Sequence, residues 1–572
     1  MMMFFAYMFV DMMSPLQSLI EGQRGWSPDV FGAYGSSEYL LNVFGFLIIA
    51  GIILDKMGIR FTGTLSASLM VIGAAIKFYA VSDWFVGSNL EATLTSWQVM
   101  NLPGTALLAC LGFMIFGCGC EMAGITVSRA IAKWFKGKEM AMAMGLEMAI
   151  ARIGVFAIFT MSPAVANSEM FAFIPTSVVK PVFLCTVLLI VGLLCFLVFN
   201  VMDKKFDKQL AAAGEAEEVS GEEEFKISDV KVILSSKIFW LVALLCVLYY
   251  SAIFPFQKYA VNMFENNLNL TAEEAASIFR WFPIGAALIT PFLGGFLDKR
   301  GKGATMLILG AILMISCHLV FALVLPQHPN LLLAYAAIVV LGVSFSLVPA
   351  ALWPSVPKLM PERYLGSAYS LIFWVQNVGL CLVPYIIGIV LNSTNPGVSD
   401  AFQNKNQIET LQAKVEYIAN IKAHEADIEL FNELEAAKAA EATVEAEAVE
   451  TEVEATEAVE ATEEVVAEQE VVRTLPEGFD IAKCQQELDK LNKEKAAQGI
   501  SNDFNYEIAV AQLEALKVEK EQKNYPDSPR YDYTATMLLF VSFGVLALLF
   551  GFWLKIEDKR KGYGLELPNI KE

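Results

Sequence analysis

The sequence predicts an all-α membrane protein, with twelve transmembrane helices in two six-helix bundles and a helical, low-complexity insert outside the membrane. Hydrophobic residues make up 56% of the chain and charged residues only 18%, a composition too apolar for a soluble protein of this length. The apolar residues gather into runs of about 20, the length that crosses a bilayer. A polar stretch after the sixth run divides the twelve runs into two halves.

Each run is interpreted as one membrane helix. The first half has runs at residues 1–20, 31–54, 61–82, 103–131, 140–163 and 179–201. The first of them has no charged leader and no small-residue cleavage site, so it predicts a helix and not a signal peptide. The second half has runs at residues 238–261, 274–297, 304–325, 331–352, 365–391 and 533–554.

The runs define the expected domains. These are an N-terminal bundle (1–201), a cytoplasmic linker (202–237), helices seven to eleven (238–391), an acidic insert (392–532), and helix twelve with a tail (533–572). Lysine and arginine gather in alternate loops, such as those that contain Lys56 and Lys299. By the positive-inside rule both termini are expected in the cytoplasm. We expect the protein to lie in the cell (inner) membrane and to work as a monomer.

The insert holds nearly all of the net charge of −20. Ile408, Leu411, Val415 and Ile418 have coiled-coil spacing, and Leu488, Leu491, Leu513 and Leu516 indicate a second helical arm. A run rich in Glu, Ala, Val and Thr joins the two arms. Two interpretations stay open: the arm contacts a partner outside the membrane, or it is a tolerated loop insertion.

One turn motif occurs in both halves. "GIILDKMGIR" follows the second run and "GGFLDKRGKG" follows the eighth, and this recurrence indicates an internal repeat. The glycines permit a tight turn, the aspartates can cap or pair with a neighbouring helix, and the basic residues anchor the turn at the headgroups. The motif predicts a gate, with a purely topological turn as the alternative. Its residues are Gly51, Asp55, Lys56, Gly58 and Arg60, and Gly294, Asp298, Lys299 and Gly301.

Twelve runs, a central linker and paired D-K-x-G turns resemble the major facilitator superfamily. Longer strings, among them "AKWFKGKEMAMAMGLEMAIARIG", "FWLVALLCVLYYSAIFPFQKY" and "DMMSPLQ", are similar to its lysosomal dipeptide transporter branch. The resemblance implies two bundles that rock about a midplane site, and uniport of dipeptides. It also implies that a carboxylate of the fourth helix and an arginine of the fifth, here Glu121 and Arg152, hold the two ends of the substrate. The chain departs from the branch in its long insert and in having no leader with a lysosomal sorting signal.

The spacing of Glu121 and Arg152 supports a shared depth in the membrane. Glu121 lies 13 residues before Trp134 and Arg152 lies 13 after Glu139. On a helical hairpin that turns between these residues, both lie about 20 Å from the turn, near the middle of the bilayer. A charge at that depth needs a partner or water. Either the two side chains form a structural ion pair, or they bind the ammonium and carboxylate of a zwitterion.

Further polar and aromatic residues are predicted to line the same cavity. Asp11 lies too deep in the first helix to be an end cap, and its carboxyl group could titrate. The other candidates are Tyr249, Tyr250, Trp353, Gln376 and Asn377, each of which could instead pack against neighbouring helices or lipid. Lys258 lies near the outer end of the seventh helix, where snorkelling to the headgroups is the default interpretation and a contact with the substrate or a gate is the alternative.

The function predicted from the sequence is transport of dipeptides or similar small zwitterions by alternating access. Two alternatives stay open: a proton-coupled symporter of organic anions or sugars, and a receptor or scaffold that uses the outer arm. The sequence contains no nucleophile, phosphate-loop or metal-ligand arrangement, so neither an enzyme nor a cofactor or metal site is predicted. The expected partners are the small-molecule substrate and the lipid bilayer, and not nucleic acid.

Overall fold

The computed structural model describes residues 1–135, 140–212, 227–360, 365–450, 475, 479–495, 500 and 504–568. The chain forms two compact units. The first contains Met1–Gln403 and Pro526–Glu572, and the second contains Asn404–Tyr525, which lies within the predicted insert of 392–532. In the described ranges every regular element is a helix, so the predicted all-α fold class is confirmed.

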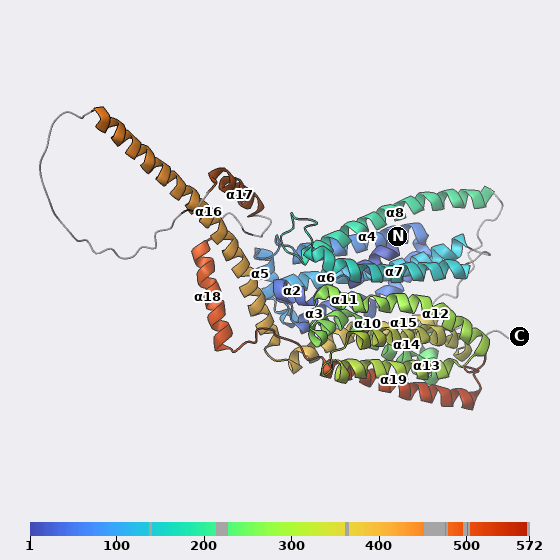
Figure 1. The fold of residues 1–572 in the computed structure, drawn as a ribbon. Helices are drawn as coiled ribbons and strands as arrows, with labels where there is room; N and C mark the ends of the chain where they lie inside the picture. The colour runs from blue at the N-terminus through green and yellow to red at the C-terminus, as the bar shows by residue number, and fades with distance from the viewer. Residues whose placement is uncertain are drawn as a thin grey trace. The chain divides into compact units, whose positions relative to one another are not determined.

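The first half of the larger unit contains eight α-helices and two short 3-10 helices (Figure 1). In chain order they are α1 (Met2–Asp11), η1 (Ser14–Leu16), α2 (Gln17–Arg24), α3 (Pro28–Val43), α4 (Phe46–Val81), α5 (Asn89–Ser96), η2 (Val99–Asn101), α6 (Gly104–Trp134), α7 (Met140–Asn167) and α8 (Val179–Ala212). The expected linker of 202–237 begins inside α8, and residues 213–226 of it lie outside the described part.

The second half begins with the short helix α9 (Ile227–Leu234). Its further elements are α10 (Lys237–Leu268), α11 (Ala272–Phe279), α12 (Trp281–Arg300), α13 (Gly303–Leu319), the π-helical turn η3 (Val320–Val324), α14 (Leu331–Leu359), α15 (Leu365–Thr394) and α19 (Thr534–Lys561). The last helix, α19, lies beside α13 (Figure 1), so the chain returns after the insert to complete this bundle.

Eleven helices of the described residues are long and apolar enough to cross a membrane. The sequence predicts twelve spans, and the one that has no helix of its own among these eleven is the second, at residues 31–54. Gly45, with φ of 94°, separates α3 from α4, and Gly58, with φ of 74°, bends α4 in its interior. Both values are accessible to glycine at little cost. The second span is therefore divided between α3 and the start of α4, and the third span is the rest of α4.

Glycines also let two helices of different halves meet. A Cβ atom on Gly32 of α3 would lie 2.5 Å from the carbonyl oxygen of Pro384 in α15. A Cβ atom on Gly388 of α15 would lie 2.3 Å from the carbonyl oxygen of Pro28. Both distances are shorter than any van der Waals contact, so only glycine permits this approach. The approach brings the two halves together near the start of α3.

The smaller unit is built from α16 (Val398–Glu450), most of which it contains, with α17 (Ile481–Glu494) and α18 (Tyr506–Gln522). Its small core buries Ile418, Ile421, Leu488 and Ile500. His424 of α16 lies 3.3 Å from a carboxylate oxygen of Glu487 in α17; its bond to the carbonyl of Asn420 and this carboxylate raise the pKa of His424 above its usual range. The predicted acidic run at residues 451–474 lies outside the described residues.

Candidate substrate site and gates

Glu121 and Arg152 project from neighbouring helices, α6 and α7, and both are half-buried. Within the described part of the chain neither side chain has a hydrogen bond or an ion pair. Arg152 instead faces two aromatic rings of the other half, with its guanidinium carbon 5.9 Å from the ring centre of Phe254 and 5.6 Å from that of Phe345. The predicted hairpin turn includes residues 136–139, which lie outside the described ranges. The structural ion pair between Glu121 and Arg152 is thus not formed in this conformation.

A buried polar cluster joins the two halves beside this pair. Gln257 of α10 donates a hydrogen bond of 2.5 Å to Asp11, at the end of α1. The ammonium of Lys258 lies 3.2 Å from a carboxylate oxygen of Glu38 in α3 and 4.0 Å from one of Asp11. Lys258 is only 5% exposed, so the snorkelling interpretation is wrong. Its charge is compensated inside the protein and does not reach the headgroups.

The cluster lies on one defined side of Arg152. α10 runs from Lys237, near the membrane face that carries the two D-K-x-G turns, to Leu268 at the opposite face. We call these the turn face and the far face. Lys258 follows Phe254 by four residues on this helix, about 6 Å nearer the far face. The cluster therefore lies between Arg152 and the far face.

Lys77 of α4 is a buried cation that the sequence analysis did not identify. Its side chain is fully buried, and its ammonium has no hydrogen-bond partner among the described residues. It lies 4.3 Å from the ring centre of Phe9 and 4.8 Å from those of Tyr34 and Phe113. Ring faces attract cations. A lysine in the middle of an apolar run was the available signal.

The remaining predicted site residues divide into two groups. Tyr250 and Trp353 lie with the rings that face Arg152: Tyr250 stacks on Phe254 at 5.5 Å, and the indole of Trp353 donates to the hydroxyl of Tyr250. The others bond elsewhere. Tyr249 donates to the carbonyl of Leu307, Gln376 accepts from the thiol of Cys246, and Asn377 donates to the carbonyl of Phe373. The structure does not bring these three together with Arg152.

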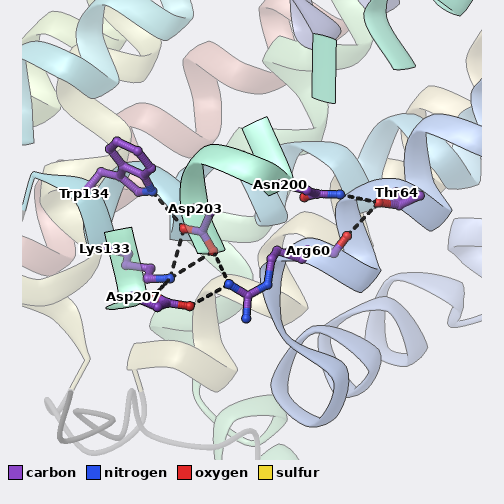
Figure 2. Close-up of polar contacts among 7 residues, drawn as sticks. All are labelled: Arg60, Thr64, Lys133, Trp134, Asn200, Asp203 and Asp207. Atoms are coloured by element: carbon purple, nitrogen blue, oxygen red, sulfur yellow. Dashed lines mark hydrogen bonds and ion pairs between the residues drawn. The ribbon is translucent and has the colours of Figure 1, made fainter. Parts of the chain in front are cut away.

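The first D-K-x-G turn makes ion pairs with the helices beside it (Figure 2). Arg60 lies 3.0 Å from Asp203 and 2.5 Å from Asp207, both in α8. Lys133 of α6 bonds the same two carboxylates, and Trp134 donates to Asp203. Asp55 pairs with Arg129 of α6. Of the other residues in this turn, Lys56 is exposed, Gly58 supplies the bend, and Gly51 has open space around it.

The second turn is covered by the tail that follows α19. Gly301 has φ of 70° and would clash with the carbonyl of Glu566 if it carried a Cβ atom. The amides of Lys302 and Gly303 donate to the carbonyls of Glu566 and Leu565 at 3.1 and 3.0 Å, and the amide of Thr305 donates to the carboxylate of Glu566 at 2.9 Å. Lys299 is exposed, Asp298 is half-buried, and Gly294 has open space around it.

The two halves are also bonded to each other at the far face. Tyr259 of α10 donates to the carbonyl of Pro28 at 3.2 Å, and Asn392 of α15 donates to Asp29 at 2.9 Å. The amide of Tyr385 donates to the hydroxyl of Ser36 at 3.0 Å. With the close approach of α3 and α15, these bonds close the far face in this conformation.

Comparison with known proteins places the fold and the site in context. The family model of the Major Facilitator Superfamily matches residues 1–384. The chain is 30% identical over 355 residues to the lysosomal dipeptide transporter MFSD1 of Danio rerio, covering 60% of this chain and 68% of that protein. It is 28% identical over 289 residues to the Homo sapiens protein of the same name, covering 49% and 59%.

Solved transporters share the fold at low sequence identity. A bacterial homolog to the human lysosomal transporter Spinster, in an inward-facing and unoccupied conformation, has a TM-score of 0.54 at 14% identity and covers 100% of this chain and 96% of its own. A single-site mutant of the nucleoside transporter NupG has a TM-score of 0.52 at 12% identity and covers 69% and 92%. These likenesses concern the fold alone. The family match and the MFSD1 relatives show that the chain is a multi-pass transmembrane transporter of small molecules, not an enzyme, and that it belongs to the major facilitator superfamily.

Proposed function

We propose that this transporter carries dipeptides or similar small zwitterions by uniport. The observation that carries the proposal is the pair of opposite charges, Glu121 and Arg152, neither of which has a hydrogen bond or an ion pair with a described residue. A dipeptide presents an ammonium at one end and a carboxylate at the other. A carboxylate accepts from the first, and a planar guanidinium donates two parallel hydrogen bonds to the second. The relatives from Danio rerio and Homo sapiens are named as dipeptide transporters.

Alternating access follows from the way in which the halves are joined. In the proposed cycle, the substrate enters from the turn face while the far face is closed by the Lys258 cluster and by α3 and α15. The halves then rock, the far-face contacts break, and the two D-K-x-G turns act as gates on the turn face. Tyr250, Trp353 and Asp11 border the site in this proposal, with Tyr249, Gln376 and Asn377 behind the lining.

The remaining features of the proposal concern the cellular setting. We place both termini in the cytoplasm, because the turns rich in lysine and arginine lie on the same side as the C-terminal tail. We propose the cell membrane as the location, a monomer as the working form, and the smaller unit as the surface for any partner outside the membrane.

The test is uptake into proteoliposomes with a panel of radiolabelled dipeptides. Glu121→Gln and Arg152→Lys are each expected to reduce uptake at least tenfold, because each removes a charge-assisted hydrogen bond worth about 1.5–3 kcal/mol. Arg560→Gln, on the exposed end of α19, is the matched control. Wild-type uptake by both variants would refute the assigned roles.

The same vesicles distinguish uniport from symport. Uniport predicts that an imposed pH gradient does not drive accumulation of a dipeptide above its outside concentration. Accumulation that follows the gradient would favour the proton-coupled alternative, and Asp11 would then be the first carboxylate to replace.

A further inference from the structure

The rings that face Arg152 come from the half of the chain to which Arg152 does not belong. Phe254 is on α10 and Phe345 on α14, and the two rings meet edge to face at 5.6 Å. Tyr250 holds both, with ring centres 5.5 Å from Phe254 and 5.8 Å from Phe345, and Phe282 packs on Phe345 at 6.0 Å. The two rings are therefore fixed by their own half and form a preformed support for the guanidinium.

Two carboxylates of the neighbouring polar cluster, Asp11 and Glu38, are engaged by other groups. Asp11 accepts from Gln257, and Glu38 is paired with Lys258. Among the described residues no carboxylate lies within ion-pair distance of Arg152. The guanidinium is thus held by ring faces and not by an anion.

Aromatic support has a different consequence from that of an ion pair. A ring face attracts the cation through its quadrupole and uses none of the five N–H donors of the guanidinium. A carboxylate partner would occupy two of these donors and neutralise the charge. Ring support therefore keeps the charge of Arg152 in place and leaves its donor edge available for an incoming anion.

We propose that Phe254 and Phe345 are positioning residues for carboxylate recognition: they hold Arg152 across the boundary between the halves, so that it can bind the carboxylate end of the substrate. The inference rests on the proposed function. It also predicts that binding of the substrate's carboxylate end depends on the second half, through the rings that hold Arg152. Binding of the ammonium end does not, because Glu121 has no such support from the rings.

The test compares each dipeptide with its C-terminal amide, which keeps the ammonium and lacks the carboxylate. Inhibition of uptake by both compounds is measured for the wild-type chain and for Phe254→Leu and Phe345→Leu. The wild-type chain is expected to prefer the acid, and each Leu variant to lose about tenfold of this preference while its affinity for the amide is unchanged. Phe254→Tyr, which keeps the ring face, is expected to retain the preference.

The preference is a ratio measured within one protein, so it does not depend on expression or on the fraction that folds. Phe321→Leu is the matched control, because Phe321 is a fully buried ring of the same half that packs on Phe256 and Phe264. An unchanged preference in both Leu variants, with dipeptide uptake intact in the wild-type chain, overturns this inference alone. Absence of dipeptide uptake by the wild-type chain overturns both it and the proposed function.

Discussion

Three cations inside the larger unit are stabilised in two different ways. Lys258 has two carboxylates, Arg152 has two rings of the opposite half, and Lys77 has three rings of its own half. The two solutions suit different tasks, since an ion pair fixes both partners whereas a ring leaves the donors of the cation available. At this scale the Lys258 pair is a structural tie between the halves, whereas Arg152 keeps its donors available for the ligand of the proposed function.

Removal of the cation at position 258 should therefore destabilise the conformation with a closed far face. Lys258→Met leaves Glu38 and Asp11 buried without their cation, and loss of one partner of a buried pair costs about 3–5 kcal/mol. A double-mutant cycle with Glu38→Gln, followed by thermal unfolding in detergent, should show that the second change recovers part of this loss. Arg560→Met, which breaks an exposed pair with Glu557, should cost about 1 kcal/mol or less. Additive effects of Lys258→Met and Glu38→Gln would contradict the pairing.

A residue count along a helix bears on the depth of a side chain and not on its partners. Glu121 and Arg152 could be assigned to one depth because the rise per residue of a helix is constant. The rings around Arg152 and Lys77 depend on how each helix is rotated about its axis and on which helices become neighbours. Neither quantity is contained in a residue count, so the sequence cannot tell that Lys258 pairs with Glu38 and does not snorkel to the headgroups.

At the scale of elements, breaks inside the apolar runs decide where each helix begins and ends. The predicted first run is interrupted between Asp11 and Gln17, where η1 joins α1 to α2, and this break exposes Asp11 to Gln257. The predicted second run is interrupted at Gly45, whereas the bend at Gly58 lies between the predicted second and third runs, where the turn is expected. A hydropathy window averages over about 20 residues, so it finds the runs and misses breaks that keep the segment apolar.

The tail after α19 should protect the second turn. Deletion of the residues after Gly562 removes the acceptors for the amides of Lys302, Gly303 and Thr305, and each lost bond contributes about 1 kcal/mol. Hydrogen exchange of these amides, followed by mass spectrometry, should become about tenfold faster or more. Glu557→Gln, in the last turns of α19 before the tail, keeps these bonds and should leave the exchange unchanged. Equal protection in the truncated and full chains would show that the tail is not bound to the turn in solution.

At the scale of the whole molecule the two halves use one repeated turn with different partners. In the first half Arg60 pairs with Asp203 and Asp207 at the end of α8. In the second half the corresponding turn is bonded by the backbone and by Glu566 of the segment after α19. The repeat could be predicted from the motif. The partners could not, because they belong to chain segments that share no motif.

Closure of the far face should depend on the absence of a side chain at Gly388. In Gly388→Val, a Cβ atom 2.3 Å from the carbonyl oxygen of Pro28 would force α15 and α3 apart, so the closed conformation loses population to those open at this face. The matched control is Gly285→Val on α12, where a Cβ atom meets nothing within 4 Å.

The readout is alkylation of a cysteine introduced by Ser36→Cys, at a position that is 8% exposed in the closed far face. Mass spectrometry of its peptide distinguishes it from the nine native cysteines. Alkylation should be about tenfold faster in the Gly388→Val background, because this change implies a shift of about 1.4 kcal/mol between the two conformations, and dipeptide uptake should fall with it. The Gly285→Val background should match the wild-type chain in both measurements. Equal reactivity of the introduced cysteine in all three backgrounds would mean that α3 and α15 do not control this face, and the closing of the far face would then have to depend on the Lys258 cluster alone.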